Sequence, residues 1–295
     1  MPGTGGRPPM PRPTAAVAAT APANPIARLW DWAVARQLRA VDAEYIDPAR
    51  TSDSRILWVV YSSCMALYLL NYVVLDWDVQ HGVSSWLIER FDLFSDMGKG
   101  GKGIRLRLAL TMRVTWSLGC MIFYLGVPLL VVPLVLRRKL STLGLSPRGF
   151  FRHLWVYALL FLPVGVCVWI VSYQQAFQST YPFYRNPATL AHLLVWELFY
   201  GLQFFSLEVF FRGFMLTELK HRWGWRAMLF MMTPYCMIHF SKPALEALGA
   251  VIAGSVLGVL ALRTRSIWGG VAIHVSVAWW MDIASLLQRG WFSKG

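Results

Sequence analysis

The stretch LWVYALLFLPVGVCVWIVSY, Leu154–Tyr173, contains no charged side chain. A helix of about 20 apolar residues, rising ~1.5 Å per residue, can span the roughly 30 Å of hydrocarbon in a bilayer. Six further segments are predominantly apolar: Ile56–Leu75, Val114–Leu136, Leu193–Leu216, Ala227–His239, Leu248–Leu262 and Ile267–Leu287. The sequence therefore predicts an all-α fold, a polytopic transmembrane helix bundle of about seven spans.

The composition also indicates a membrane protein. Of the 295 residues, 56% are hydrophobic and 15% are charged, whereas soluble domains carry about 25% charged residues. The formal net charge of +13 could indicate nucleic-acid binding. However, the arginines and lysines lie between the apolar segments, where the positive-inside rule and anionic lipids favour them. We therefore expect the lipid bilayer, and no nucleic acid, as a partner.

The cysteines and the common catalytic signatures narrow the chemistry further. Each cysteine lies in a different apolar segment without CxxC spacing; they are Cys64, Cys120, Cys167 and Cys236. We expect neither a disulfide nor a zinc cluster from them. No HExxH, GxSxG, Walker or GxGxxG pattern occurs, which argues against a zincin, a serine hydrolase, a nucleotide-driven pump and a dinucleotide enzyme.

The charges of the short loops predict how the chain is oriented. Loop 137–152 carries five basic residues, whereas loop 173–192 carries only Arg185. Because basic loops tend to stay in the cytosol, we expect the N-terminus inside and the C-terminus outside. Loop 77–107 contradicts this alternation, since it should lie outside but carries Arg90, Lys99, Lys102, Arg105 and Arg107. We interpret its apolar part, Trp86–Phe94, as a helix on the membrane surface.

Ionisable residues inside apolar segments are the candidates for chemistry, and four stand out: Glu208, Arg212, His239 and His274. A charge at the bilayer centre costs roughly 3 kcal/mol even on a lenient insertion scale. Glu208 and Arg212 are four residues apart, so they share a helix face and can pair. Taken alone, the pair is better explained as neutralisation of a buried charge. A single membrane histidine is likewise more often an interhelical hydrogen bonder.

The depths of these residues favour a shared site. Counted from the predicted cytosolic ends at about 1.5 Å per residue, Glu208 lies roughly 13 Å deep, His274 roughly 10 Å and His239 roughly 19 Å. Three groups from three helices can therefore meet in one layer. A carboxylate with two imidazoles suits activation of water and stabilisation of an oxyanion better than it suits packing.

Three short motifs follow one another along the same region, namely Leu207-Glu208-x-x-x-Arg212, Tyr235-x-x-x-His239 and His274-x-x-x-Ala278. In order and spacing they resemble the Glu-Glu-x-x-x-Arg, Phe-x-x-x-His and His-x-x-x-Asn motifs of the CAAX-protease and bacteriocin-processing family of intramembrane proteases. The resemblance covers about residues 190–285. It implies a membrane-embedded endopeptidase with Glu208, His239 and His274 as catalytic residues and Arg212 in support.

The chain departs from the family pattern at three positions. Leu207 takes the place of the glutamate usually assigned to activating water, Tyr235 replaces a phenylalanine, and Ala278 replaces the asparagine that helps to hold the oxyanion. Asp282 lies one turn beyond Ala278 and is a candidate substitute. The sequence is similar to a bacterial form with a single glutamate.

The segment HFSKPALE, His239–Glu246, belongs to this resemblance. It implies that the base is Glu208, or else Glu246 folded back beside His239. Two histidines and a carboxylate could also hold zinc with an open position, so a divalent metal stays possible, although no cofactor is required by the sequence. Glu197, three turns before Glu208, is expected to lie at the interface, and Arg113 and Asn71 near span ends are expected to snorkel or pair.

From these observations we expect an intramembrane endopeptidase that cleaves a membrane-associated protein or peptide in a bacterial inner membrane. The catalytic core would be residues 190–288, preceded by a disordered Pro/Ala-rich tail (1–25), an amphipathic interfacial segment (26–55) and N-terminal transmembrane helices (56–189), and followed by a short tail (289–295). Two alternatives remain. One is a catalytically inactive relative acting as a scaffold or immunity protein; the other is a small-solute or ion carrier.

Overall fold

The computed structural model describes residues 24–293 and shows helices and connecting turns, without a strand among those residues. It divides into two units, one ending at Gln37 and the other beginning at Leu38. The described part of the first unit contains α1 (Pro25–Trp30), a π-helical η1 (Asp31–Ala35) and the start of α2 (Arg36–Tyr45). The predicted tail, residues 1–25, lies almost entirely outside the described residues.

Six helical stretches in the described part of the chain are long and apolar enough to cross a membrane. They are Asp53–Val74, Gly101–Val135, Leu154–Val171, Leu190–Met237, Ala244–Thr264 and Trp268–Gln288. The all-α polytopic fold is thereby confirmed, and the protein is an integral membrane protein.

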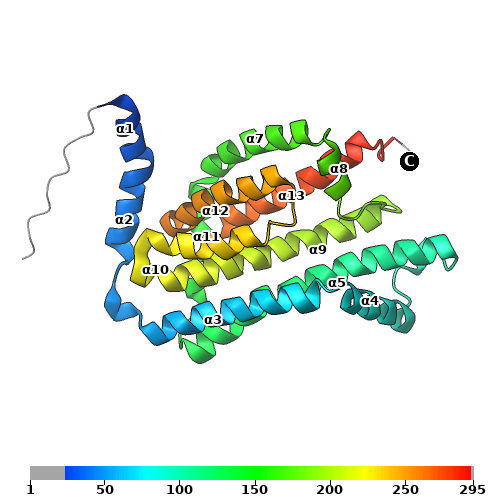
Figure 1. Ribbon diagram of the computed structural model, residues 1–295, viewed down its shortest axis with the longest axis horizontal. Helices are drawn as coiled ribbons and strands as arrows, with labels where there is room; N and C mark the ends of the chain where they lie inside the picture. The colour runs from blue at the N-terminus through cyan, green and yellow to red at the C-terminus, as the bar shows by residue number, and fades with distance from the viewer. Residues whose placement is uncertain (1–23, 294–295) are drawn as a thin grey trace, which may run out of the picture. The chain divides into compact units, whose positions relative to one another are not determined.

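The predicted number of seven spans is not confirmed, because the fourth and fifth predicted segments fall within the single helical stretch Leu190–Met237. This stretch consists of α9 (Leu190–Glu208), the π-helix η7 (Val209–Leu216), α10 (Thr217–Trp223), η8 (Gly224–Arg226) and α11 (Ala227–Met237). Gly224 has a φ of +54°, so the chain turns there. Figure 1 shows α11 running back beside α9, and it packs against η7. At about 1.5 Å per residue, α11 is too short to cross a bilayer alone.

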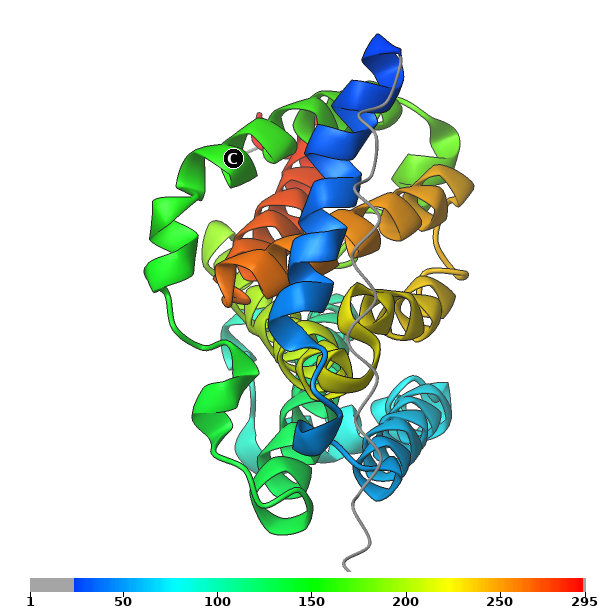
Figure 2. The ribbon, with the colours of Figure 1, turned by 90° about the vertical axis from the view of Figure 1, so that its left-hand side faces the viewer.

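The other helices are α3 (Asp53–Leu69), η3 (Leu70–Val74), α4 (Trp77–Phe91), α5 (Gly101–Leu130), η5 (Val131–Val135), α6 (Arg148–Arg152), α7 (Leu154–Val171), α8 (Gln175–Thr180), α12 (Ala244–Thr264) and α13 (Trp268–Gln288). Four short 3-10 segments connect them, namely η2 (Pro48–Arg50), η4 (Ser95–Met97), η6 (Leu140–Leu143) and η8. Figure 2 views the long helices from their ends.

The helix α9 holds the bundle together, because it packs against both α5 and α13, and α13 packs in turn against α7. The phenylalanines that follow α9 in η7, Phe210, Phe211 and Phe214, have no exposed surface and lie in the largest apolar core. By contrast, α7 leaves large apolar side chains such as Trp155 and Leu159 mostly exposed. A helix that is apolar on every side and packed on only one suits a lipid environment.

Two predicted boundaries were wrong. The helix α4 begins at Trp77, nine residues before the predicted surface helix, with the side chain of Asp76 capping its first turn. The helix α5 begins at Gly101 and not near Val114. Lys102, Arg105 and Arg107 therefore lie on the first turns of a helix and not in a loop, which is why the loop charge count was irregular there.

Candidate active site

A carboxylate, a guanidinium and an imidazole meet where α9 passes into η7. Glu208 is the last residue of α9 and Arg212 lies in η7, one turn later, and neither side chain has any exposed surface. Arg212 Nη1 donates a hydrogen bond of 2.9 Å to Glu208 Oε1. His274 of α13 brings its Nδ1 to 2.6 Å from the same oxygen. This contact lacks hydrogen-bond geometry, and Nδ1 has no hydrogen-bond partner.

The hydroxyl of Tyr235 occupies the other side of the His274 ring. Tyr235, in α11, lies with its hydroxyl oxygen 2.6 Å from His274 Nε2. Phe204 stacks on the imidazole with ring centroids 5.5 Å apart and planes 9° from parallel. The Arg212 guanidinium lies 4.3 Å from the centre of the Tyr235 ring, a cation–π contact. The ring of His274 is therefore held on both edges and on one face.

His239 joins this group through Tyr235. Its Nδ1–H donates a hydrogen bond of 2.8 Å to the Tyr235 carbonyl oxygen, one turn earlier in the chain. The two rings lie 4.8 Å apart between centroids. Because Nδ1 carries the hydrogen in this arrangement, Nε2 of the neutral ring is an acceptor. The structure thus places His239 beside Tyr235, whereas Arg212 and His274 each contact Glu208 directly.

Two glycines at the start of α13 make the close approach of Glu208 possible. A Cβ atom built on Gly270 would overlap Oε2 of Glu208, and one built on Gly269 would overlap the ring of Tyr157. With hydrogen atoms in place of side chains, the first turn of α13 lies directly against the carboxylate. Any larger residue at position 270 must displace it.

Several polar atoms of this cluster have no hydrogen-bond partner, namely Glu208 Oε2, Arg212 Nε, Arg212 Nη2 and His274 Nδ1. Buried polar atoms are rarely left without partners, because each loses its hydration without compensation. Their concentration in one place makes this cluster the candidate functional site. Within residues 24–293, no three His, Cys, Asp or Glu side chains group closely enough to hold a metal ion.

The two acids named as possible substitutes lie elsewhere. Both oxygens of Glu246, in the first turn of α12, accept from the Tyr181 hydroxyl at 2.8 Å. The indole N–H of Trp196 donates to Asp282 Oδ2 at 2.8 Å. Among the described residues, neither acid makes a hydrogen bond or ion pair with Glu208 or His239, so the structure gives no support for Glu246 folded back beside His239.

The residue expected at the interface, Glu197, is instead only 8% exposed, and neither of its carboxylate oxygens has a hydrogen-bond partner. Its nearest acidic neighbour is Asp282. Arg113, expected to snorkel or pair, lies partly buried against the ring of Phe183.

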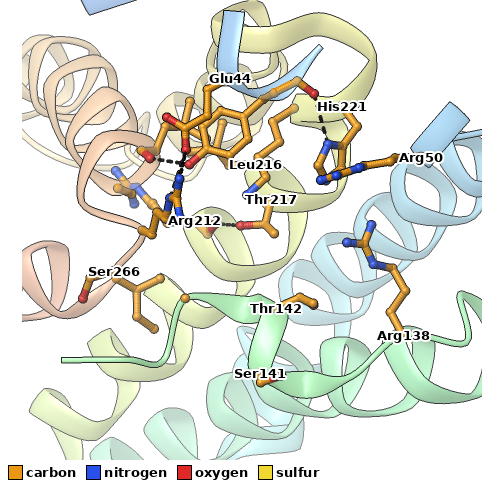
Figure 3. A pocket seen from close by; sticks show the side chains of 17 residues that line it. Glu44, Arg50, Arg138, Ser141, Thr142, Arg212, Leu216, Thr217, His221 and Ser266 are labelled. Carbon is orange, nitrogen blue, oxygen red and sulfur yellow. Dashed lines mark hydrogen bonds and ion pairs between the residues drawn. The ribbon is translucent and has the colours of Figure 1, made fainter. Parts of the chain in front are cut away.

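A polar cavity of about 360 Å³ lies beyond Arg212, at the end of the bundle that carries the basic loop 137–152 (Figure 3). Its lining includes Glu44, Lys220 and Arg265, and Arg265 Nε donates to Glu44 Oε1 at 2.9 Å. Burial would raise the pKa of Glu44, but hydrogen bonds from Arg265 and Tyr45 leave it below its ordinary value. Burial also raises the pKa of Tyr45 to about 12.

The fold and the buried Glu–Arg–His cluster define an integral membrane protein with a candidate hydrolytic site. Residues 189–280 match a family model described as type II CAAX prenyl endopeptidase Rce1-like. This confirms the resemblance to the CAAX-protease family, a family of peptidases, for the part of the chain that contains Glu208, Arg212, His239 and His274. Searches of curated proteins and of solved structures gave no match.

Sequence reasoning missed three contributors to the cluster. Tyr235 counted only as a mild replacement of a phenylalanine, yet its hydroxyl contacts His274. Phe204 gave no signal beyond its spacing of four residues from Glu208. Gly270 could have been recognised, because two adjacent glycines interrupt a run of larger side chains in WGGVAIH.

Proposed function

We propose that this protein is an intramembrane endopeptidase that hydrolyses a peptide bond in a membrane-associated protein or peptide. The observation that carries the proposal is the buried Glu208 carboxylate, held through one oxygen by Arg212 and His274, inside the segment that matches an endopeptidase family. A carboxylate fixed in this way has one free oxygen, Oε2, that can accept a proton from water.

In the proposed reaction, Glu208 Oε2 takes a proton from a water molecule while the water oxygen bonds to the scissile carbonyl carbon. Arg212 keeps the carboxylate ionised and oriented. When the carbon–nitrogen bond breaks, the proton passes from Glu208 to the leaving amine. His239, whose Nε2 is an acceptor, helps to orient the water.

The oxyanion that forms on the carbonyl needs a donor. We propose that His274 donates through Nε2 to the phenol oxygen of Tyr235. The hydroxyl hydrogen of Tyr235 is then free to bind the oxyanion. This pair would do the work that Ala278, a buried methyl group packed in an apolar cluster, cannot do.

The substrate and the setting are further parts of the proposal. We infer a bacterial inner membrane with the N-terminus in the cytosol, from the loop charges and the Pro/Ala- and arginine-rich composition. A bacterial membrane protein or peptide is preferred over a prenylated one on the same grounds. The proposed reaction uses no organic cofactor and no metal ion.

One observation favours a second candidate, an inactive relative that acts as a membrane scaffold. Leu207, at the position of the family's first glutamate, is 4% exposed and packs in the main apolar core. Position 207 therefore supplies no second carboxylate to the site. If Glu208 cannot act alone as the base, the protein binds its partner without cleaving it.

The decisive experiment presents purified protein in detergent with a library of membrane peptides and detects cleavage by mass spectrometry. Wild type is compared with Glu208→Gln, and Glu197→Gln is the control because it neutralises another buried carboxyl of the same helix. We expect cleavage by wild type and by the control but not by Glu208→Gln. Cleavage by Glu208→Gln at the wild-type rate would refute the mechanism. Binding without cleavage by wild type would favour the scaffold, and transport of a solute in vesicles would favour the carrier.

A further inference from the structure

A second, larger cavity of about 970 Å³ lies at the opposite end of the bundle from the cavity of Figure 3. Its lining comes from the ends of four candidate spans: Trp77 follows Asp53–Val74, Lys102 begins Gly101–Val135, residues 183–188 precede Leu190–Met237, and Trp291 follows Trp268–Gln288. In Figure 1 the start of α5, the start of α9 and the end of α13 all lie at the right-hand end. The cavity therefore lies where the spans leave the hydrocarbon.

The lining of this cavity is strongly basic. It contains four cations, Lys102, Arg105, Arg113 and Arg185, and no acidic residue. Like charges gathered in a cleft with low-dielectric walls repel one another and attract an anion. Such an arrangement is costly unless something of opposite charge occupies it.

The neighbouring acids do not neutralise these cations, because they have other partners. Asp92 pairs with Arg107 at 2.6 Å and with Lys99 at 3.8 Å. Asp96 lies 2.9 Å from Nε2 of His192. Within residues 24–293, none of the four lining cations makes an ion pair within 4.0 Å. Asp282 acts on Arg113 only from a greater distance.

The remaining lining is apolar and aromatic, and this points to an amphiphile. On α5, Leu106, Ala109 and Met112 alternate with the basic residues along the cavity wall. Trp77 and Trp291 lie at the span ends, where tryptophan favours the headgroup region of a bilayer. Lys102 and Arg113 are eleven residues apart on α5, roughly 16 Å along the helix. A small inorganic anion would meet only one end of such a cavity.

We propose that this cavity binds the phosphate headgroup of an anionic phospholipid, with the glycerol and the start of the acyl chains against the apolar wall. Arg105, Arg113 and Arg185 can each offer a planar pair of donors to phosphate oxygens. Basic cavities between transmembrane helices are suited to such headgroups. The proposal also accounts for Lys102 and Arg105 among the basic residues of segment 77–107, and it does not depend on the proposed peptidase activity.

The test measures thermal unfolding of the full-length protein in a neutral detergent. The probes are short-chain phosphatidylglycerol, phosphatidylcholine of the same chain length, and inorganic phosphate. The test variant is Lys102→Gln with Arg105→Gln, two exposed residues whose loss should leave the fold intact. The control is Arg90→Gln with Lys99→Gln, which removes the same charge nearby but outside the cavity.

We expect phosphatidylglycerol to raise the unfolding temperature of wild type in a saturable way. Phosphatidylcholine should not do so, because its headgroup has no net charge. In the test variant the apparent affinity should fall by about tenfold or more, and in the control it should stay within about twofold. An equal loss of affinity for phosphatidylglycerol in both double variants would overturn the proposal. An equal rise in the unfolding temperature with phosphatidylcholine would overturn it as well. A full response to inorganic phosphate alone would overturn the assignment to a lipid.

Discussion

The two oxygens of Glu208 have different surroundings, and that difference determines what the residue can do. Arg212 and His274 both lie against Oε1, whereas Oε2 has no partner and lies beside Gly270. The first oxygen fixes the carboxylate in place, and the second is left to react. A substitution beside Oε1 should therefore affect the stability of the protein, whereas a substitution beside Oε2 should affect cleavage.

Removing Arg212 should destabilise the protein. Arg212→Ala leaves the Glu208 carboxylate buried without its partner, and breaking such a pair costs roughly 3–5 kcal/mol. Arg113→Ala is the control, since Arg113 is basic and within a span but makes no ion pair with an acid within 4.0 Å. Thermal unfolding in detergent should show a clear loss for Arg212→Ala only. Similar unfolding temperatures for the two variants would mean that the buried pair adds no stability.

A single methyl group at Gly270 should also be harmful. In Gly270→Ala the new Cβ overlaps Oε2 of Glu208, so the carboxylate must move away from the position in which it would accept a proton from water. We expect loss of cleavage at near-normal expression. Gly249→Ala is the matched control, because a Cβ there meets nothing within 4 Å. The turnover of a cleaved peptide is measured for both variants. Normal turnover in Gly270→Ala would contradict the role proposed for Oε2.

At this scale the sequence allowed part of the site to be predicted. Glu208, Arg212 and His274 were recognisable because ionisable groups are costly inside apolar segments. Glu246 was assigned from the family resemblance and Asp282 from its position one turn beyond Ala278, and neither kind of evidence determines side-chain direction. Tyr181 and Trp196, their actual partners, come from segments that no local pattern connects with them.

At the scale of elements, hydropathy was a good guide to the existence of helices and a poor one to their ends. It gave no indication that η7 is a π-helix or that Gly224 makes the turn between the separately predicted segments Leu193–Leu216 and Ala227–His239. Both features depend on how neighbouring helices pack. The early start of α5 was missed because Arg107, a charged residue, is buried there by hydrogen bonds to Asp92 and Leu93.

The end of α2 is attached to the bundle by interactions that depend on pH. Tyr45 donates to the Leu262 carbonyl at 2.8 Å, and Arg265 binds Glu44. The folded pKa of Glu44 lies below its ordinary value of 4.5. Its contribution is therefore complete above that value and is lost as the pH falls through the folded pKa.

We expect amide hydrogen exchange in residues 38–45 to become faster on acidification below about pH 4.5, relative to the rest of the bundle. Glu44→Gln should remove most of this dependence, because the glutamine does not titrate. Glu89→Gln, at an exposed position of α4, is the control and should behave as wild type. An unchanged acid response in Glu44→Gln would show that another group is responsible.

At the scale of the whole molecule, the two cavities lie at opposite ends of the long helices, and the loop charges alone assign one end to the cytosol. A reporter fused to the C-terminus should therefore be active outside the cytosol, and one inserted near Arg138 should be active inside it. Paired phosphatase and fluorescent-protein fusions measure this. The reverse pair of results would show that the predicted orientation in the membrane is wrong, but it would not change the arrangement of the helices in the bundle.

The catalytic residues should fail together. Glu208→Gln, His239→Ala and His274→Ala should each abolish cleavage, and the triple variant should be no worse than the single ones, because members of one catalytic unit are non-additive. Turnover at matched protein level, with circular dichroism as the check on folding, decides the matter. Independent, multiplying losses would separate His239 from the other two, since it contacts the cluster through Tyr235.

The π-helix η7 also has a consequence for how the sequence can change. Its eight residues follow Glu208 directly, and a π-helix accommodates a residue that a regular α-helix of the same length would not hold. Successive residues of an α-helix differ by about 100° around the axis. Deleting one residue from η7 would leave the hydropathy and charge of the segment and every motif residue outside the deletion unchanged. It would nevertheless rotate α9 against α10 by about that angle. Glu208 would then face away from Gly270, so the site depends on the number of residues as well as on their kind.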